Sequence, residues 1–507
     1  MNPEAGFSRE IEQKLRWLEN VQPTDWKNPR PAPAYNLVVI GAGTAGLGAA
    51  LGAAALGAKV ALVENQHLGG LCLNAGGVLS QSLIKASRLV RHLRPDGDFG
   101  VGLPQPSQVD FGQVMARVRK VRSELSWNDS ATRISGLGVD VFWGAARFHD
   151  RRTVRVADLS LRFSRALIAT GSRPILPEVA GLPEAGFLTS DSVFEIRQRP
   201  QRLAVLGGGP LGCELAQAFL RLGVRVLLLE KSGHLLDRED ADAAALLQAA
   251  FAAEGMDVVL SAELLEAERR GNKKTLRYRA EGQEVNVVVD EILVATGRAP
   301  RVDGLDLEKA GVHFSRSRGV AVNAFLQTSN PRIFAAGDVC TARGFRQGAE
   351  ATARVVVRNA LFPGKTCMDF FQLPRCIGTD PEIGHVGRTE KEIKAARLPY
   401  ESFTHHLRDT DRGAIDQETT GFIKVHAHRK THRLLGATCV GAHAGELLPA
   451  LTLAMQQGLT LGDLARMIQP YPAQAELLRQ AALAYKRTRL TPVRRQWLAR
   501  WLVWQRR

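Results

Sequence analysis

The feature that most constrains the fold of this chain is a segment that occurs twice. Residues 35–64 read YNLVVIGAGTAGLGAALGAAALGAKVALVE, and residues 202–230 read RLAVLGGGPLGCELAQAFLRLGVRVLLLE. Each copy has a short apolar run, a glycine-rich turn, an amphipathic stretch and a second apolar run that ends in glutamate. This order is typical of a βαβ unit with parallel strands. We therefore expect an α/β protein with two similar, Rossmann-like nucleotide-binding domains.

The glycines of the first copy have the spacing of a dinucleotide-binding turn. Gly41 permits the tight turn, Gly43 lets the backbone approach a pyrophosphate, and Gly46 lets helix and strand pack closely. The free N–H groups at the start of the following helix favour an anion. Glu64 ends the second strand, where its carboxylate is expected to bond a ribose. An isolated glycine fingerprint also occurs in ordinary turns, but the flanking strands, helix and glutamate favour nucleotide binding.

The second copy satisfies the same requirements. Its glycines are Gly207, Gly209 and Gly212, and its terminal acid is Glu230. A carboxylate here bonds a 2′-hydroxyl and repels a 2′-phosphate, so NADH is favoured over NADPH, although the adjacent lysine opposes this preference. Two dinucleotide units in one chain predict a tightly held flavin and a diffusing nicotinamide.

Three later segments support the duplication. LIATGSRP at 167–174 follows the first unit, and LVATGRAP at 293–300 follows the second. Both are predicted strands that end in Thr-Gly where the chain crosses between domains. A third apolar run, NPRIFAAGDV at 330–339, ends in Gly-Asp. From about Phe371, strand patterns are followed by helical patterns, which predicts a separate α+β domain.

The composition disfavours several classes of protein. The net charge of +16 comes without a zinc-finger spacing, an RNA-binding aromatic motif or a leucine zipper, so we expect a solvated arginine-rich surface and no nucleic acid. The cysteines are widely spaced without a C-x-x-C pair, which favours a reducing compartment over a disulfide-stapled secreted fold. The N-terminal residues lack the apolar core of a signal peptide, and no uncharged run reaches transmembrane length. We expect a cytoplasmic protein, at most peripheral to a membrane.

From about residue 35 to residue 492, the sequence resembles the pyridine nucleotide–disulfide oxidoreductases, the family of lipoamide dehydrogenase, glutathione reductase and mercuric reductase. The resemblance rests on both glycine fingerprints, both Ala-Thr-Gly segments, Ala336-Gly337-Asp338, Thr379–Glu382 and Tyr471–Glu476. The mercuric-reductase-like branch is the most similar, including its RTRLTP ending at 487–492. The resemblance implies a homodimer formed through the C-terminal domain.

The resemblance also assigns cofactors and domains. It implies FAD at Gly41, Gly43, Gly46, Glu64, Gly70, Thr170, Gly171, Gly337 and Asp338, and nicotinamide at Gly207, Gly209, Gly212, Glu214, Glu230 and Gly297. The expected segments are an N-terminal helical extension (1–34), an FAD-binding domain in two parts (35–171 and 297–370), an NAD(P)-binding domain (172–296), a dimerisation domain (371–489) and a basic amphipathic tail (490–507).

The chain departs from the family pattern where the redox disulfide is expected. Relatives carry two cysteines five positions apart and then Pro-Ser-Lys, whereas this chain has Cys72, Gly77 and Gln81. The resemblance implies that the missing thiol is the one nearest the flavin and that Cys72 is the outer one. Thiol–disulfide exchange needs both, so the relay cannot run. Without the lysine, Glu214 loses a cationic partner and the reduced flavin loses a stabilising charge, so the flavin potential should fall.

The C-terminal acid–base group is altered as well. Many relatives have His-Pro-Thr followed by glutamate, whereas this chain has Tyr471-Pro472-Ala473 with Glu476 retained. A tyrosine with its usual pKa of ~10 is a poor base at neutral pH but donates hydrogen bonds. Soluble transhydrogenases are similar in keeping only the first cysteine and carrying Tyr-Pro. They retain the lysine that is Gln81 here.

These residues predict an FAD-dependent NAD(P)H oxidoreductase whose small-molecule acceptor is not a disulfide. Quinone, dioxygen, an artificial dye and a second nicotinamide remain open as acceptors. One alternative is a mercuric or disulfide reductase, which the missing cysteine opposes. Another is a weakly catalytic redox sensor or scaffold that binds FAD and NAD. Cys72 is either a reactive thiol or a relic packed under the flavin, and we favour the relic.

The C-terminal tail and the histidines allow further interpretations. Trp497, Trp501 and Trp504 have helical spacing and arginines around them, which predicts a basic amphipathic helix. Such a helix either lies on an anionic membrane or docks on its own dimer or on the N-terminal helix. The histidines of the C-terminal domain, among them His426 and His428, alternate along a strand, which favours a solvated or interface face over a metal site.

Overall fold

The computed structural model describes residues 3–93, 109–341 and 345–506. Contacts divide the chain into two compact units. Of the described residues, the second unit contains His234–Gly255 and those from Phe371 onward, and the first unit contains the others. Within the described residues, no helix has the length and apolar character needed to cross a membrane.

The first unit contains a sheet of seven strands in the order β3-β2-β1-β6-β5-β4, with β18 paired to β6. The strands β3, β2, β1, β6 and β18 are parallel, whereas β4 and β5 form antiparallel pairs at one edge. Parallel strands need crossover connections, and the expected βαβ unit supplies the first of them. The strand bounds are β1 Tyr35–Ile40, β2 Val60–Glu64, β3 Val139–Trp143, β4 Ala146–Asp150, β5 Thr153–Val156, β6 Leu159–Ile168 and β18 Ile333–Ala335.

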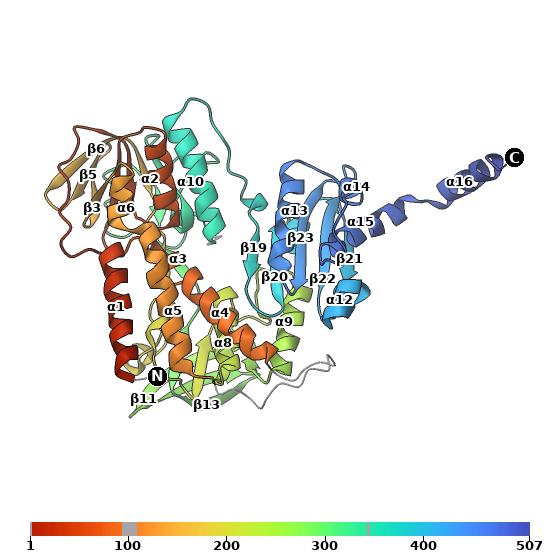
Figure 1. The fold of residues 1–507 in the computed structure, drawn as a ribbon, viewed down its shortest axis with the longest axis horizontal. Helices are drawn as coiled ribbons and strands as arrows, with labels where there is room; N and C mark the ends of the chain where they lie inside the picture. The colour runs from red at the N-terminus through yellow and green to blue at the C-terminus, as the bar shows by residue number, and fades with distance from the viewer. Residues whose placement is uncertain (1–2, 94–108, 342–344, 507) are drawn as a thin grey trace. The chain divides into compact units, whose positions relative to one another are not determined.

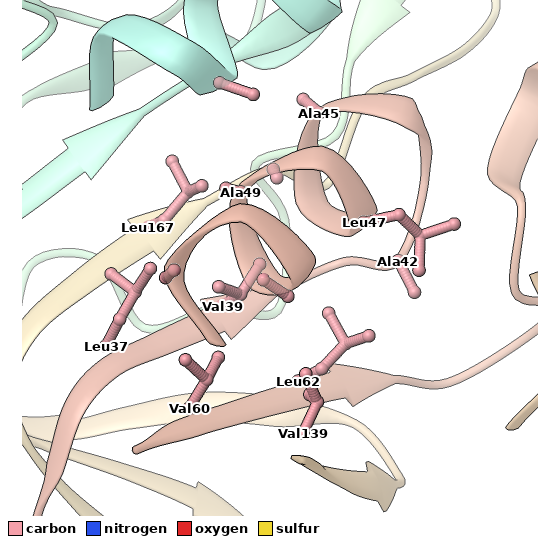
Figure 2. Packing of buried hydrophobic residues seen from close by; sticks show 14 of the residues in the cluster. Leu37, Val39, Ala42, Ala45, Leu47, Ala49, Val60, Leu62, Val139 and Leu167 are labelled. Carbon is pink, nitrogen blue, oxygen red and sulfur yellow. The ribbon is translucent and has the colours of Figure 1, made fainter. Parts of the chain in front are cut away.

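Helix α2 covers one face of this sheet because the strand residues alternate between two cores. Leu37 and Val39 of β1 pack with the alanines of α2, and Val38 and Ile40 belong to the core on the opposite face. Figure 2 shows the small side chains of α2 above Leu37, Val39, Val60 and Leu62. The helices of this part of the unit are α1 Pro3–Val21, α2 Thr44–Ala55, α3 Gly70–Asn74, α4 Gly77–His92, α5 Phe111–Leu125, α6 Ala131–Gly136 and α10 Arg346–Leu361.

The second nucleotide unit builds a separate parallel sheet in the order β10-β9-β8-β14, and an antiparallel sheet, β11-β12-β13, accompanies it. The two Thr-Gly segments also meet, because β7 and β15 form an antiparallel pair. The bounds are β7 Ser172–Pro174, β8 Arg202–Leu206, α8 Pro210–Arg221, β9 Arg225–Leu229, β10 Asp257–Val259, β11 Glu263–Arg270, β12 Lys273–Ala280, β13 Gln283–Val289, β14 Glu291–Val294 and β15 Arg298–Pro300.

The second compact unit is a five-stranded sheet with helices, in the order β19-β20-β23-β22-β21. Helices α13 and α15 supply apolar residues to its core, and Figure 1 labels both beside this sheet. Helix α9 joins the unit because Lys424 of β22 forms ion pairs with Asp240 and Asp242 at 3.0 and 2.8 Å. The bounds are α9 Ala241–Ala253, β19 Arg375–Ile377, β20 Glu382–Gly387, α11 Glu390–Ala395, β21 Tyr400–His406, α12 Asp411–Asp416, β22 Phe422–His428, β23 Leu434–Gly441, α13 Ala444–Gln456, α14 Leu461–Leu464, α15 Glu476–Arg489 and α16 Pro492–Trp504.

The expected C-terminal helix is present as α16, but its amphipathic character is not. All of its large apolar side chains are exposed, and they lie on every side of the helix. Trp497 stacks on Trp501 and Trp501 packs on Trp504, so the three rings form one stripe. Leu498 and Leu502 lie outside this stripe, which the tryptophan spacing alone did not reveal.

Candidate functional site

The first glycine turn has the geometry expected of a dinucleotide-binding loop. Gly41 has φ +99°, and a Cβ there would lie 2.5 Å from the carbonyl oxygen of Ala169. A Cβ on Gly46 would overlap the carbonyl oxygen of Gly41. Gly43 precedes α2 as its N-cap residue. The N–H groups of the first turn of α2 are therefore left to bind an anion.

The second turn repeats these contacts in detail. Gly207 has φ +108°, a Cβ there would lie 2.6 Å from the carbonyl oxygen of Ala295, and a Cβ on Gly212 would overlap the carbonyl oxygen of Gly207. Gly209 is the N-cap residue of α8 and has open space around its missing Cβ. The alanines that meet the two turns both belong to Ala-Thr-Gly segments. The duplication in the sequence is thus a duplication in structure.

The two strand-terminal glutamates hold their own glycine loops. Glu64 accepts hydrogen bonds from the N–H of Ala42 at 2.8 Å and from two residues that follow it. Glu230 accepts from the N–H of Gly208 and from that of Ser232. Each carboxylate therefore lies beside the loop on which a dinucleotide would rest. The ribose contact expected of each remains a prediction.

A close approach of two backbones shapes the pyrophosphate site. Gly70 has φ +55°, and a Cβ there would lie 2.5 Å from Cα of Gly43. Only glycine fits at such a contact. The start of α3 and the start of α2 thus form a cradle without side chains. Its shape and the free N–H groups of α2 suit the pyrophosphate of FAD.

An indole of the N-terminal extension secures this cradle. Trp17 Nε1 donates to Asn74 Oδ1 at 2.9 Å, and Asn74 Nδ2 donates to the carbonyls of Leu68 and Gly70 at 2.8 and 2.9 Å. The Trp17 ring also stacks on His67 and lies under the guanidinium of Arg122. Sequence reasoning missed this contact because Trp17 and Asn74 are 57 residues apart. In Figure 1, α1 lies beside α5, with which it is in contact.

We expect Trp17→Phe to weaken FAD binding about fivefold, because it removes one net hydrogen bond of ~1 kcal/mol from Asn74. The measurement is the dissociation constant of FAD from the reconstituted apoprotein. Trp26→Phe is a matched control, since Trp26 Nε1 donates to Val141 O at 3.1 Å, away from the cradle. Equal effects of the two variants would show that Trp17 contributes only to general stability.

The Thr-Gly and Gly-Asp segments converge around Asp338. Ser172 Oγ donates to Asp338 Oδ2 at 2.7 Å, and Arg298 Nε donates to the same hydroxyl at 2.9 Å. Gly171, Gly297 and Gly337 all have positive φ. Thr170 bonds the carbonyl of Arg301 at 2.6 Å and so holds its segment in place. Arg298 stands in the second Ala-Thr-Gly segment, but its contact with Ser172 was not predicted from the sequence.

The expected disulfide position holds one thiol opposite a glycine. Cys72 is half-buried in α3, and a Cβ on Gly77 would lie 3.3 Å from Cys72 Sγ. Gln81 is exposed one turn further along α4. Glu214 is half-buried on α8 and has an interaction within the described chain. The expected loss of its cationic partner remains a prediction.

Two other thiols of this unit lie beside the cofactor motifs, and neither replaces the missing one. Cys340 follows the Gly-Asp segment, where burial and the charge of Asp338 raise its pKa to about 12. Cys213 is buried, donates to the carbonyl of Gly208 at 3.2 Å, and has its pKa raised by burial and by nearby glutamates. Both remain protonated at neutral pH and are poor nucleophiles.

In the second unit, Tyr471 and Glu476 have separate partners. Tyr471 Oη donates to Asp411 Oδ2 at 3.0 Å, and this bond and the charge of Asp411 raise the pKa of the phenol above its ordinary value. Tyr471 is therefore a hydrogen-bond donor rather than a base at neutral pH. Glu476 accepts from Gln480 at 3.0 Å, and its charge acts on His405 of β21. Asp411 was not indicated by the sequence.

Two of the C-terminal histidines are buried and have polar partners, so His426 does not lie on the solvated face that its alternation with His428 favoured. His426 and His385 are fully buried; His426 bonds Ser402 at 2.7 Å and His385 bonds Thr438 at 2.9 Å. Burial and nearby Arg375 lower the pKa of His385 to about 3, so it is neutral. No group of three potential metal ligands occurs among the residues that the structure describes.

Comparison with protein-family models identifies the chain. A model described as pyridine nucleotide-disulphide oxidoreductase matches residues 35–358, and that family's dimerisation domain matches residues 373–482. The chain belongs to this family. It is therefore an FAD-dependent oxidoreductase that uses a nicotinamide dinucleotide and carries the family's dimerisation domain, which confirms the expected fold class and enzyme class.

Individual relatives agree with this membership. Mercuric reductase of Staphylococcus aureus is 34% identical over 451 residues, which are 89% of this chain and 82% of the relative. Dihydrolipoyl dehydrogenase of Thermus scotoductus is 35% identical over 464 residues, 89% of this chain and 97% of the relative. Among solved structures, LpdA of Mycobacterium tuberculosis has a TM-score of 0.80 at 26% identity, covering 89% of this chain and 99% of LpdA.

Proposed function

We propose that this family member oxidises NADH or NADPH through FAD as a homodimer and passes the electrons to a small-molecule acceptor that is not a disulfide. The observation that carries the proposal is Cys72 opposite Gly77, where a second thiol would have to stand. In the described part of the chain no cysteine forms a disulfide, and the Cys213 and Cys340 thiols beside the cofactor motifs are held protonated.

The residues of the chain would act by binding and orientation. The Gly41–Gly46 turn and the Gly70 cradle would hold the pyrophosphate of FAD, and Asp338, which accepts a hydrogen bond from Ser172, would bind its ribityl chain. The turn at 207–212 holds the nicotinamide dinucleotide. FAD, when bound, would supply the two-electron chemistry between reduced nicotinamide and the acceptor. Tyr471 donates a hydrogen bond and abstracts no proton.

The acceptor is tested with a panel of oxidants and the purified FAD-loaded protein. Quinone, dioxygen, an artificial dye and thio-NAD should each be offered with NADH, beside oxidised lipoamide, oxidised glutathione and Hg(II). We expect turnover with at least one of quinone, dioxygen, the dye and thio-NAD, and no turnover with the disulfides or Hg(II). The alternative is reduction of a disulfide or of Hg(II), which the mercuric reductases and dihydrolipoyl dehydrogenases among its relatives favour. Binding of both cofactors with no turnover would instead favour a redox sensor or scaffold.

We propose a preference for NADH because Glu230 lies at the nicotinamide loop. A carboxylate there repels a 2′-phosphate, and we expect kcat/KM for NADH to exceed that for NADPH about tenfold, equivalent to ~1.4 kcal/mol. Glu230→Gln should narrow the ratio because it removes the charge. Lys231→Gln, at the exposed neighbouring position, should widen it. A ratio that is the same in all three proteins would contradict the assignment.

We further propose that α16 contacts anionic membrane surfaces, because its tryptophans form one exposed stripe and its arginines stand without an acidic residue. Flotation with phosphatidylserine vesicles should carry the intact protein, and changing Trp497, Trp501 and Trp504 to alanine should abolish this. Trp127→Ala removes an equally exposed indole elsewhere and serves as the control. Flotation that is equal in all variants would remove the membrane proposal.

A further inference from the structure

Arg346 lies against the surviving thiol of the altered disulfide site. It is the first residue of α10, and its Nη1 donates to Cys72 Sγ at 3.2 Å. Its Nε donates to Glu350 Oε1 at 2.9 Å, one turn further along the helix. Two contacts in different directions thus hold the guanidinium beside α3. Arginine keeps its charge at any physiological pH, so a fixed positive charge stands at this point.

The same end of α10 contacts the other FAD segment. Thr352 Oγ1 accepts a hydrogen bond from the N–H of Gly337 at 3.1 Å. A Cβ on Gly337 would lie 3.3 Å from Ala45 of α2 and 3.7 Å from Ala349 of α10. The first turns of α10 are therefore packed on Gly337 and on the start of α2. Arg346 projects from this helix end to α3, so it lies between the two segments that the family resemblance assigns to FAD.

The charge of Arg346 acts on Asp129, which lies beside the loop that carries Cys72. Asp129 approaches this loop, since a Cβ on Gly69 would lie 2.9 Å from Asp129 Oδ2. Burial raises the pKa of Asp129, and the charges of Arg346 and Arg133 oppose that rise. The field of Arg346 therefore reaches the Gly69–Gly70 cradle. Glu350 offsets part of the charge of Arg346. The side chains of both residues are substantially exposed, so solvent weakens the attraction between them.

We propose that Arg346 supplies the positive charge of the flavin site in place of the lysine that is Gln81 in this chain. The inference rests on the proposed function, in which FAD is bound between these segments. Two-electron reduction adds negative charge to the flavin, and a cation nearby stabilises that charge and raises the reduction potential. The fall in potential expected from the loss of the lysine is then offset by a residue distant in sequence.

The test is the midpoint potential of the bound flavin, measured anaerobically against a reference dye. Arg346→Gln should shift the equilibrium between oxidised and reduced flavin at least tenfold toward the oxidised form, a change of ~30 mV for a two-electron couple. Arg346→Lys should stay close to the parent protein. Arg354→Gln is the matched control, because Arg354 is exposed on the same helix, two turns away.

A charge relocation keeps the proposal testable if the single variant binds FAD poorly. Adding Gln81→Lys to Arg346→Gln should return the potential to within about threefold of the parent equilibrium. An unchanged potential in Arg346→Gln, or equal shifts in Arg346→Gln and Arg354→Gln, would overturn the proposal. Because this readout involves no acceptor, it is separate from the proposed function. If the protein reduces disulfides, turnover with oxidised lipoamide or glutathione would show it, whatever the flavin potential of these variants.

Discussion

Replacing Gly77 with cysteine is expected to restore a redox disulfide with Cys72. A Cβ at position 77 already lies 3.3 Å from Cys72 Sγ, a separation close to that across a disulfide. Gly77 is not among the glycines with positive φ, so the backbone accepts a side chain there. Closing so short a loop should stabilise the oxidised protein by about 2 kcal/mol. We expect reductive titration of Gly77→Cys to consume four electrons per FAD, with a long-wavelength thiolate–flavin band.

Two controls separate a disulfide from an unrelated effect of the substitution. Thiols are counted in the oxidised proteins after unfolding. Gly77→Cys should have one thiol fewer than the double variant that carries both Gly77→Cys and Cys72→Ser. The double variant should take up two electrons only. Disulfide turnover by Gly77→Cys should remain slow, since Tyr471 with its raised pKa does not replace an imidazole. Two-electron uptake by Gly77→Cys would show that the two positions are not apposed in the holoenzyme.

The second large effect is expected from Gly46→Ala, which should abolish FAD binding. The new Cβ would overlap the carbonyl oxygen of Gly41, so α2 must shift from β1 at a cost of roughly 3 kcal/mol or more. The purified protein should be colourless and should not recover flavin on reconstitution. Differential scanning calorimetry with and without FAD should show a lower Tm and no stabilisation by the ligand.

Gly48→Ala provides the matched control in the same helix. Gly48 is exposed, and a Cβ there would make only an ordinary contact of 3.6 Å with Ala353. Alanine is the better helix former, so this variant should be equal to the parent or up to ~1 kcal/mol more stable. Gly212→Ala should repeat the effect at the second turn, with flavin retained and nicotinamide binding lost. Retention of yellow FAD-loaded protein by Gly46→Ala would contradict the assigned role of this glycine.

The sequence predicted those parts of the fold and site that local sterics determine. The glycine spacing predicted the tight turns at Gly41 and Gly207, and both residues have positive φ in the structure. The short apolar run at residues 35–40 likewise predicted the strand β1, which the structure buries on both faces. The missing thiol at position 77 was evident for the same reason, because its partner lies only five positions away.

Contacts between distant segments escaped prediction. Arg346 and Cys72 are separated by 274 positions, and Tyr471 and Asp411 by 60, so no local pattern links them. The position of α9 beside the C-terminal sheet depends on the buried charges of Asp240 and Lys424. No local sequence pattern links these two residues either. The prediction of an amphipathic tail was wrong for a different reason. Its tryptophan spacing marks a real stripe, but leucines and valine occupy the remaining faces.

The central claim is that electrons leave the flavin without a disulfide, and anaerobic titration tests it most directly. The parent protein is titrated with NADH while the flavin absorbance is followed. The claim predicts complete bleaching after two electrons per FAD, without a long-wavelength thiolate–flavin band. Uptake of four electrons per FAD, or the appearance of that band before bleaching, would contradict it.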